Sequence, residues 1–275
     1  MAESRTLAGA ETAHRHERHA RGWGGGAGSA SAEPVSAMKA PPEPALPAKL
    51  TCLARWYGGR PFRSDAGWAL RLENGFAIPF DDGSAKSFEQ RLSQPDLEDM
   101  FHDAYDTDRG PTLVTEENLD PGRYRVEELF QATYGADANA VRANLVKVKF
   151  LDSILQVHSR VAPALERVGK KLETHVKETG HRPAILSRFS GTFNWRTIAG
   201  SEQLSAHSYG IAVDLDSKAA DYWRWSDKRV WHHPLPPAIV RAFEEEGFIW
   251  GGRWYHFDTM HFEYRPEMLD TECWR

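Results

Sequence analysis

The segment 205–216 constrains the fold most, because it places carboxylates on a strand that otherwise has the pattern of a buried one. Within it, apolar side chains alternate with Asp214 and Asp216. Successive side chains of a strand point to opposite faces, so one face is apolar and the other carries two acids. Gly210 permits a sharp change of direction between His207 and this strand. A buried carboxylate needs a partner, and a cation is the simplest partner for Asp214.

A second segment, 250–264, carries matching chemistry. His261 and Glu263 share one strand face, and Asp258 precedes His261 by three residues. Two imidazoles and one carboxylate are a ligand set for catalytic zinc that leaves the fourth position to water. With His207 and Asp214 as the other ligands, Asp258 would take the proton of that water, and Glu263 is the reserve for this role.

Spacing alone leaves other roles open for these residues. Either histidine is also compatible with a packed or surface position. Asp214 is compatible with a turn cap, and Asp258 with a solvated position. The metal site is therefore a hypothesis at this point.

The order of the expected elements predicts an α+β fold, because short strands and helices are interspersed without regular βαβ alternation. The expected elements are a helix beginning at Pro121 with Asp120 as its N-cap, a helix capped by Asp137, a strand over 146–150, and amphipathic helices over 161–176 and 238–246.

Residues 1–48 are rich in Ala, Gly, Ser, Pro and Glu and nearly lack large apolar side chains, so we expect this segment to be disordered. Its basic start is not followed by an apolar stretch, and no secretory signal peptide is visible. No run approaches the roughly 18 apolar residues that span a bilayer. The formal net charge of −5 gives no indication of a nucleic-acid partner or a polybasic membrane contact.

The chain has two cysteines, Cys52 and Cys273, too few for a cysteine-based zinc site. They are compatible with a disulfide, if the two segments meet in space, and equally with two free thiols. Cysteine usage therefore leaves the compartment open.

The segments 205–214 and 248–263 together resemble the D-alanyl-D-alanine metallopeptidase family, which includes carboxypeptidases, dipeptidases and phage endolysins. The family pattern Ser-x-His-x-x-Gly-x-Ala-x-Asp is matched at its fixed positions by Ser205, His207, Gly210, Ala212 and Asp214. An acidic residue three positions before a final histidine is matched by Asp258 and His261. The resemblance implies that His207, Asp214 and His261 bind one zinc ion per chain and that Asp258 is the catalytic base.

The resemblance also implies a fold like that of hedgehog domains and DD-peptidases, with the zinc site in a cleft on a small antiparallel sheet flanked by helices. The catalytic domain would span 145–275, and 49–144 would form an N-terminal extension packed on it. The family uses an upstream arginine to stabilise the oxyanion. Arg188 and Arg196 are both candidates, and the stretch ending at Arg196 favours the latter. Substrate contacts are expected from Ser205, Tyr209 and Trp254.

The function implied is zinc-dependent hydrolysis of an amide in peptidoglycan stem peptides, by a monomeric D-Ala-D-Ala carboxypeptidase or related endopeptidase. The alternative is a non-catalytic, zinc-stabilised peptidoglycan-binding module, which would need no base at Asp258. A serine hydrolase is disfavoured, because no Gly-x-Ser-x-Gly pattern surrounds Ser205. The substrate implies the periplasm or cell envelope, although no signal peptide is visible.

Overall fold

The structure is a computed structural model that describes residues 45–225 and 228–274. These described residues form one compact unit. Most of the segment expected to be disordered, 1–48, lies outside the described residues, and Ala48 already begins a helix. None of the described helices combines the length and the apolar composition that a bilayer span needs.

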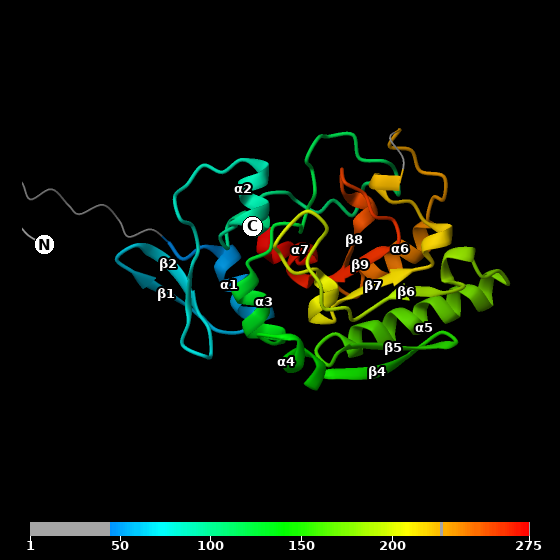
Figure 1. Cartoon of the computed structure of the whole chain (residues 1–275), viewed down its shortest axis with the longest axis horizontal. Helices are drawn as coiled ribbons and strands as arrows, with labels where there is room; N and C mark the ends of the chain where they lie inside the picture. Colours follow the sequence, from blue (N-terminus) through cyan, green and yellow to red (C-terminus); the bar gives the residue numbers. More distant parts are fainter. Residues whose placement is uncertain (1–44, 226–227, 275) are drawn as a thin grey trace, which may run out of the picture. The chain divides into compact units, whose positions relative to one another are not determined.

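Small antiparallel sheets and helices make up this unit, which confirms the α+β class (Figure 1). One sheet has the order β1-β2-β3 (Arg60–Ser64, Gly67–Arg71, Ala77–Pro79), and a hairpin pairs β4 with β5 (Leu145–Phe150, Ser153–His158). The largest sheet has the order β6-β7-β9-β8 (Phe189–Gly191, Ala212–Leu215, His261–Tyr264, Phe248–Trp250).

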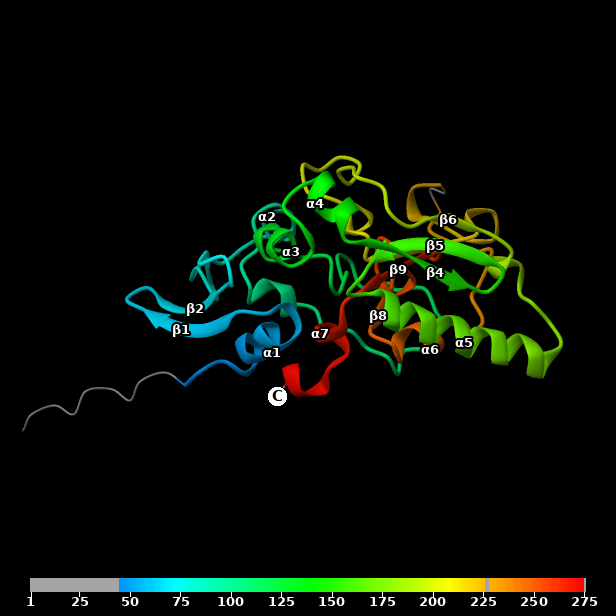
Figure 2. The same ribbon diagram turned by 90° about the horizontal axis from the view of Figure 1, so that it is seen from below.

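The helices are α1 (Ala48–Tyr57), α2 (Phe88–Ser93), α3 (Glu127–Tyr134), α4 (Ala138–Ala143), α5 (Ala162–Thr179), α6 (Pro237–Glu244) and α7 (Pro266–Leu269). Helix α5 packs against β4 and α6, and both views show it beside the β4–β5 hairpin (Figures 1 and 2). Leu165, Val168 and Leu172 are fully buried and share one face of α5. Burial of such side chains is worth roughly 1.5–3 kcal/mol each, so this face anchors the helix.

Several predicted elements are confirmed. Asp137 caps α4 by accepting hydrogen bonds from the next turn, and β4 forms where the alternation predicted a strand. Helix α5 ends at Gly180, whose φ of 64° is the left-handed conformation that favours glycine. Helix α6 forms within one or two residues of the predicted 238–246.

The prediction of a helix that begins at Pro121 is wrong, because α3 begins only at Glu127. The backbone N–H of Arg123 donates to the carbonyl of Asp120 at 3.1 Å, which closes a turn. Gly122 follows Pro121 with a φ of 86°, the arrangement of a type II turn, and this φ cannot continue a helix. The Asp120 carboxylate is therefore available for partners other than a helix terminus.

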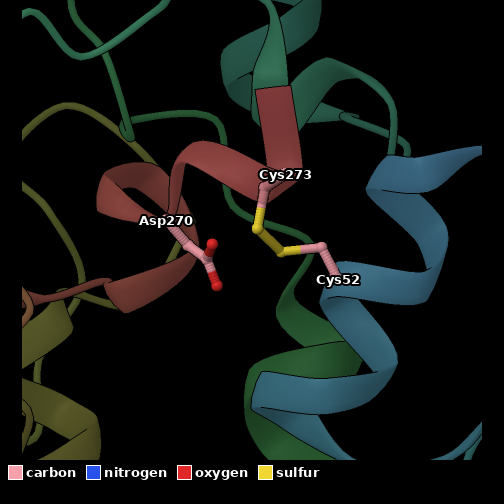
Figure 3. Close-up of side chains that lie close together, drawn as sticks. All are labelled: Cys52, Asp270 and Cys273. Atoms are coloured by element: carbon pink, nitrogen blue, oxygen red, sulfur yellow. A yellow bond between two sulfur atoms is a disulfide. The ribbon is translucent and has the colours of Figure 1, made fainter. Parts of the chain in front are cut away.

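A disulfide joins Cys52 of α1 to Cys273, whose Cα atoms are 5.4 Å apart although the residues are separated by 221 positions in the chain (Figure 3). Asp270 lies beside the two cysteines, but it pairs with Arg55 and accepts a hydrogen bond from Trp56 at 3.0 Å. Since the thiols are oxidised and the carboxylate is paired, this group is not a metal site. Of the two states that the sequence left open for Cys52 and Cys273, the structure shows the disulfide.

Candidate metal centre

The pairing of β7 with β9 creates the centre, because it sets Asp214 directly opposite His261. Paired residues on neighbouring strands project to the same side of a sheet. His207 comes from a short 3-10 turn, Ala206–Tyr209, just before β7. The turn ends at Gly210, with a φ of 67°, where an added Cβ would lie 2.7 Å from Leu145 Cδ2. A residue with a side chain is strained at this φ, so the glycine at position 210 lets the chain turn and bring His207 to the sheet.

Three side chains converge at this point. Asp214 Oδ2 lies 3.1 Å from His207 Nε2, and Asp214 Oδ1 lies 2.9 Å from His261 Nδ1. The two imidazole nitrogens are 3.2 Å apart. These ligand atoms lie within 4.8 Å of one another, so one ion could contact all three residues. The structure thus brings together the three side chains that the sequence predicts as ligands.

The outer nitrogen of each imidazole has a hydrogen-bond acceptor of its own. His207 Nδ1 lies 2.5 Å from the carbonyl oxygen of Thr192, and His261 Nε2 lies 3.2 Å from Glu263 Oε2. A proton on each outer nitrogen leaves the inner nitrogen with a lone pair for a metal. Partners of this kind orient histidine ligands in metal sites.

The centre strongly favours the ionised form of Asp214. Burial opposes ionisation, but hydrogen bonds with His207 and His261 lower the pKa of Asp214 far below its usual range. Burial likewise opposes the charged form of His261, yet hydrogen bonds to Asp214 and Glu263 raise the pKa of His261 to about 10. Asp214 therefore stabilises positive charge on this side of the pocket.

Glu263, the reserve candidate for the base, is fully buried and has other partners. Its carboxylate lies 3.2 Å from Arg125 Nη1 and 3.1 Å from Arg265 Nη1. Burial opposes ionisation, but Arg125, His261 and Arg265 hold the pKa of Glu263 well below its usual range. A carboxylate of such low basicity is a poor proton acceptor near neutral pH.

Asp258 lines the same pocket as His207, Asp214 and His261. Its Oδ1 is buried and has no hydrogen-bond partner among the described residues. Burial raises the pKa of Asp258 to about 6, with Asp214 adding to the rise and the histidines opposing it. A carboxylate with a pKa near neutrality and an unused oxygen is suited to general acid–base chemistry.

The two arginine candidates lie in different places. Arg196 lines the pocket, and its backbone N–H donates to Ser208 Oγ at 2.9 Å. Arg188 is exposed and is not among the residues that line this pocket. The placement favours Arg196 as the arginine that can reach a bound substrate.

Of the three predicted substrate contacts, Ser205 and Trp254 line the pocket, whereas Tyr209 does not. Tyr209 is 1% exposed, and its ring packs at 5.6 Å from that of Phe130 in the core. A 3-10 turn has about three residues per turn, so side chains two positions apart, such as those of His207 and Tyr209, diverge. The expectation that Tyr209 contacts substrate is therefore corrected.

Sequence reasoning missed Arg123 and His256, which also line the pocket. Both are held by Asp120, whose Oδ2 lies 3.0 Å from Arg123 Nη1 and 2.6 Å from His256 Nδ1. The available signal is the sequence Asp-Pro-Gly-Arg, which suits a tight turn as well as the start of a helix.

Comparison with known proteins bears on the same segment. Residues 199–264 match the family model described as D-alanyl-D-alanine carboxypeptidase. The match includes the three converging side chains and Asp258, and it excludes Arg123 and Arg196. No curated protein and no solved structure matches the chain. The match confirms the resemblance of the two motifs, because residues 199–264 are similar to the D-alanyl-D-alanine carboxypeptidase family.

Proposed function

We propose that this protein is a zinc peptidase that hydrolyses an amide bond in peptidoglycan stem peptides, as a D-Ala-D-Ala carboxypeptidase or a related endopeptidase. One observation carries the proposal: the inward-facing donors of His207, Asp214 and His261 share a pocket with Asp258, whose Oδ1 has no partner in the described part of the chain. A structural metal site would have no use for that carboxylate.

The donor set fits zinc. Two imidazole nitrogens and one carboxylate oxygen are three of the four ligands of a catalytic zinc site. Thr192 and Glu263 hold the outer nitrogens, so the inner ones are available without rearrangement. Zinc bound there would lower the pKa of a water molecule and polarise the substrate carbonyl.

The side chains around the centre supply the remaining chemistry. Asp258 accepts the proton of the attacking water at its free oxygen and delivers it to the leaving amine. Arg196 donates hydrogen bonds to the oxygen on which negative charge develops. Ser205 and Trp254 border the pocket and limit how a peptide enters it.

We also propose that the protein works in the periplasm or cell envelope, where peptidoglycan lies. The Cys52–Cys273 disulfide supports this location, since disulfides persist in oxidising compartments and are rare in the cytosol.

The decisive experiment is incubation with defined muropeptides, with and without a chelator. The expected result is cleavage of a stem-peptide amide that stops with the chelator and returns when zinc is restored. A protein that binds zinc and muropeptide but cleaves no stem peptide would instead be a binding module.

A further inference from the structure

One buried carboxylate holds two hydrogen-bond donors at the pocket beside the metal centre. Asp120 has no exposed surface. Its Oδ2 accepts from Arg123 Nη1 at 3.0 Å and from His256 Nδ1 at 2.6 Å, and its Oδ1 accepts from the backbone N–H of His256 at 2.9 Å. Because both side chains share one acceptor, Arg123 and His256 are fixed relative to each other.

The guanidinium of Arg123 also lies over an aromatic ring. Its Cζ is 5.7 Å from the centre of the Trp254 ring, and the indole N–H of Trp254 donates to the carbonyl of Pro121 at 2.8 Å. The turn that carries Arg123 therefore also holds the ring beneath it. This arrangement reduces the conformational freedom that the arginine would lose on binding a ligand.

Arg123 keeps unused donors in this fixed position. A guanidinium has five N–H groups, and within residues 45–225 and 228–274 only Nη1 of Arg123 has a protein acceptor, Asp120. By contrast, Arg125 is buried and engaged by both oxygens of Glu263, at 3.4 and 3.2 Å. Arg196 is exposed, and within the part of the chain that the structure describes its guanidinium donates only to the carbonyl of the neighbouring Thr197. Arg123 is thus the pocket arginine that combines a fixed position with free donors.

Arg123 also stands where two cavities meet. It lines the pocket of the metal centre and, with Ile198 and Ala199, a second pocket that extends to Glu89 of α2. Because Arg123 lines both pockets, its guanidinium can contact a peptide that extends from one pocket into the other. Planar, bidentate pairing with a carboxylate is the interaction for which arginine is best suited.

We propose that Arg123 is a specificity-determining residue that recognises a free carboxylate on a substrate residue next to the scissile amide, with Asp120 and Trp254 as its positioning residues. The inference rests on the proposed peptidase function and deepens it. In a stem peptide, the carboxylate is either the C-terminal one or the α-carboxylate of a γ-linked D-glutamate. The chemistry at Arg123 is the same for both.

The test combines a change in the enzyme with the matching change in the substrate. The free-acid pentapeptide L-Ala-γ-D-Glu-L-Lys-D-Ala-D-Ala is compared with its C-terminal carboxamide and with the form amidated at the D-Glu α-carboxylate. We expect Arg123→Gln to lower kcat/KM on the free acid roughly 10- to 100-fold, mainly through KM. On the amidated peptide that lacks the recognised carboxylate, Arg123→Gln should lower kcat/KM little below the value of the unaltered enzyme. The peptide that behaves in this way shows which of the two carboxylates Arg123 recognises.

Two further variants sharpen the test. Arg123→Lys keeps the charge without the planar fork, so it should recover part of the lost activity on the free acid. Arg60→Gln removes an exposed arginine of β1 and should match the unaltered enzyme on all three peptides.

Equal losses on acid and amide peptides in Arg123→Gln would show a merely structural role and overturn the inference. Equal rates of the unaltered enzyme on all three peptides would overturn it too, while leaving the peptidase function intact. If none of the peptides were cleaved in a zinc-dependent way, the proposed function would be refuted, and this inference with it.

Discussion

Glu263 Oε2 lies 3.2 Å from Nε2 of His261, two residues earlier on the same strand face. The contact leaves His261 Nδ1 directed at Asp214, at 2.9 Å. Arg125 and Arg265 hold Glu263 in turn. The orientation of His261 is thus set by Glu263 on its own strand and, through Glu263, by Arg125 from the segment just before α3.

Replacement of Glu263 by Gln should weaken zinc binding by about 10- to 100-fold, the usual cost of losing such a partner. The amide keeps the shape but lowers the basicity of the imidazole that it orients. Zinc affinity, measured by competition with a chromogenic chelator, tests this. Glu178→Gln, on the exposed surface of α5, is the control. Unchanged affinity in Glu263→Gln would show that the contact does not tune the site.

Replacement of Asp258 by Asn should reduce hydrolysis by about 10²–10⁴-fold, because the amide cannot take up the proton of water. Zinc content should stay at one per chain, since Asp258 is not among the three converging ligands. Turnover on muropeptides and metal analysis of the same preparation provide the two readouts. Full activity with zinc bound would remove Asp258 from the mechanism.

Replacement of Arg196 by Ala should lower kcat by about 10²–10³-fold, because the lost hydrogen bonds act on charge that develops in the transition state. KM should change much less. Arg188→Ala is the matched control, since Arg188 is exposed and outside the pocket. If the loss fell on Arg188→Ala instead, the oxyanion role would belong to that residue.

His158 should make stability fall at mildly acidic pH. It is 3% exposed, and burial lowers the pKa of His158 from 6.5 to about 4. Between these values the unfolded chain binds a proton that the folded chain does not, so folding stability decreases as the pH falls. We expect His158 to contribute a loss of about 2 kcal/mol in unfolding free energy between pH 8 and pH 5.

Urea unfolding at the two pH values checks this, with His158→Asn as the comparison. The asparagine can accept the hydrogen bond that His158 Nδ1 takes from the backbone N–H of Arg160, but it does not titrate. Between pH 8 and pH 5 the unfolding free energy of the variant should therefore fall by about 2 kcal/mol less than that of the unaltered protein. Equal sensitivity would mean that other groups cause the acid instability.

The parts of the site that sequence could predict are those defined within short segments. Alternation along 211–216 located Asp214 on the polar face of β7, and Gly210 marked the turn that follows His207. Local spacing also linked Asp258 to His261. Such features depend on strand periodicity and on backbone conformation, which nearby residues determine.

The parts that could not be predicted depend on partners far away in the chain. Asp120 has a cap-like sequence context, yet its carboxylate binds His256, 136 positions later. No local pattern reports such a contact, so the sequence predicts a helix from Pro121 where the structure has a turn. Tyr209 follows His207 by two positions, and only the geometry of the short turn shows that it belongs to the core.

The Cys52–Cys273 disulfide has a consequence for damage to the chain. A single backbone cut in a loop between the two cysteines leaves two peptides that the disulfide still links covalently. Exposed loops are the preferred sites of proteolytic nicking. A nicked molecule would therefore keep Asp120 tethered to the segments that carry His207 and His261, and its fragments would separate only when a reductant reaches the disulfide.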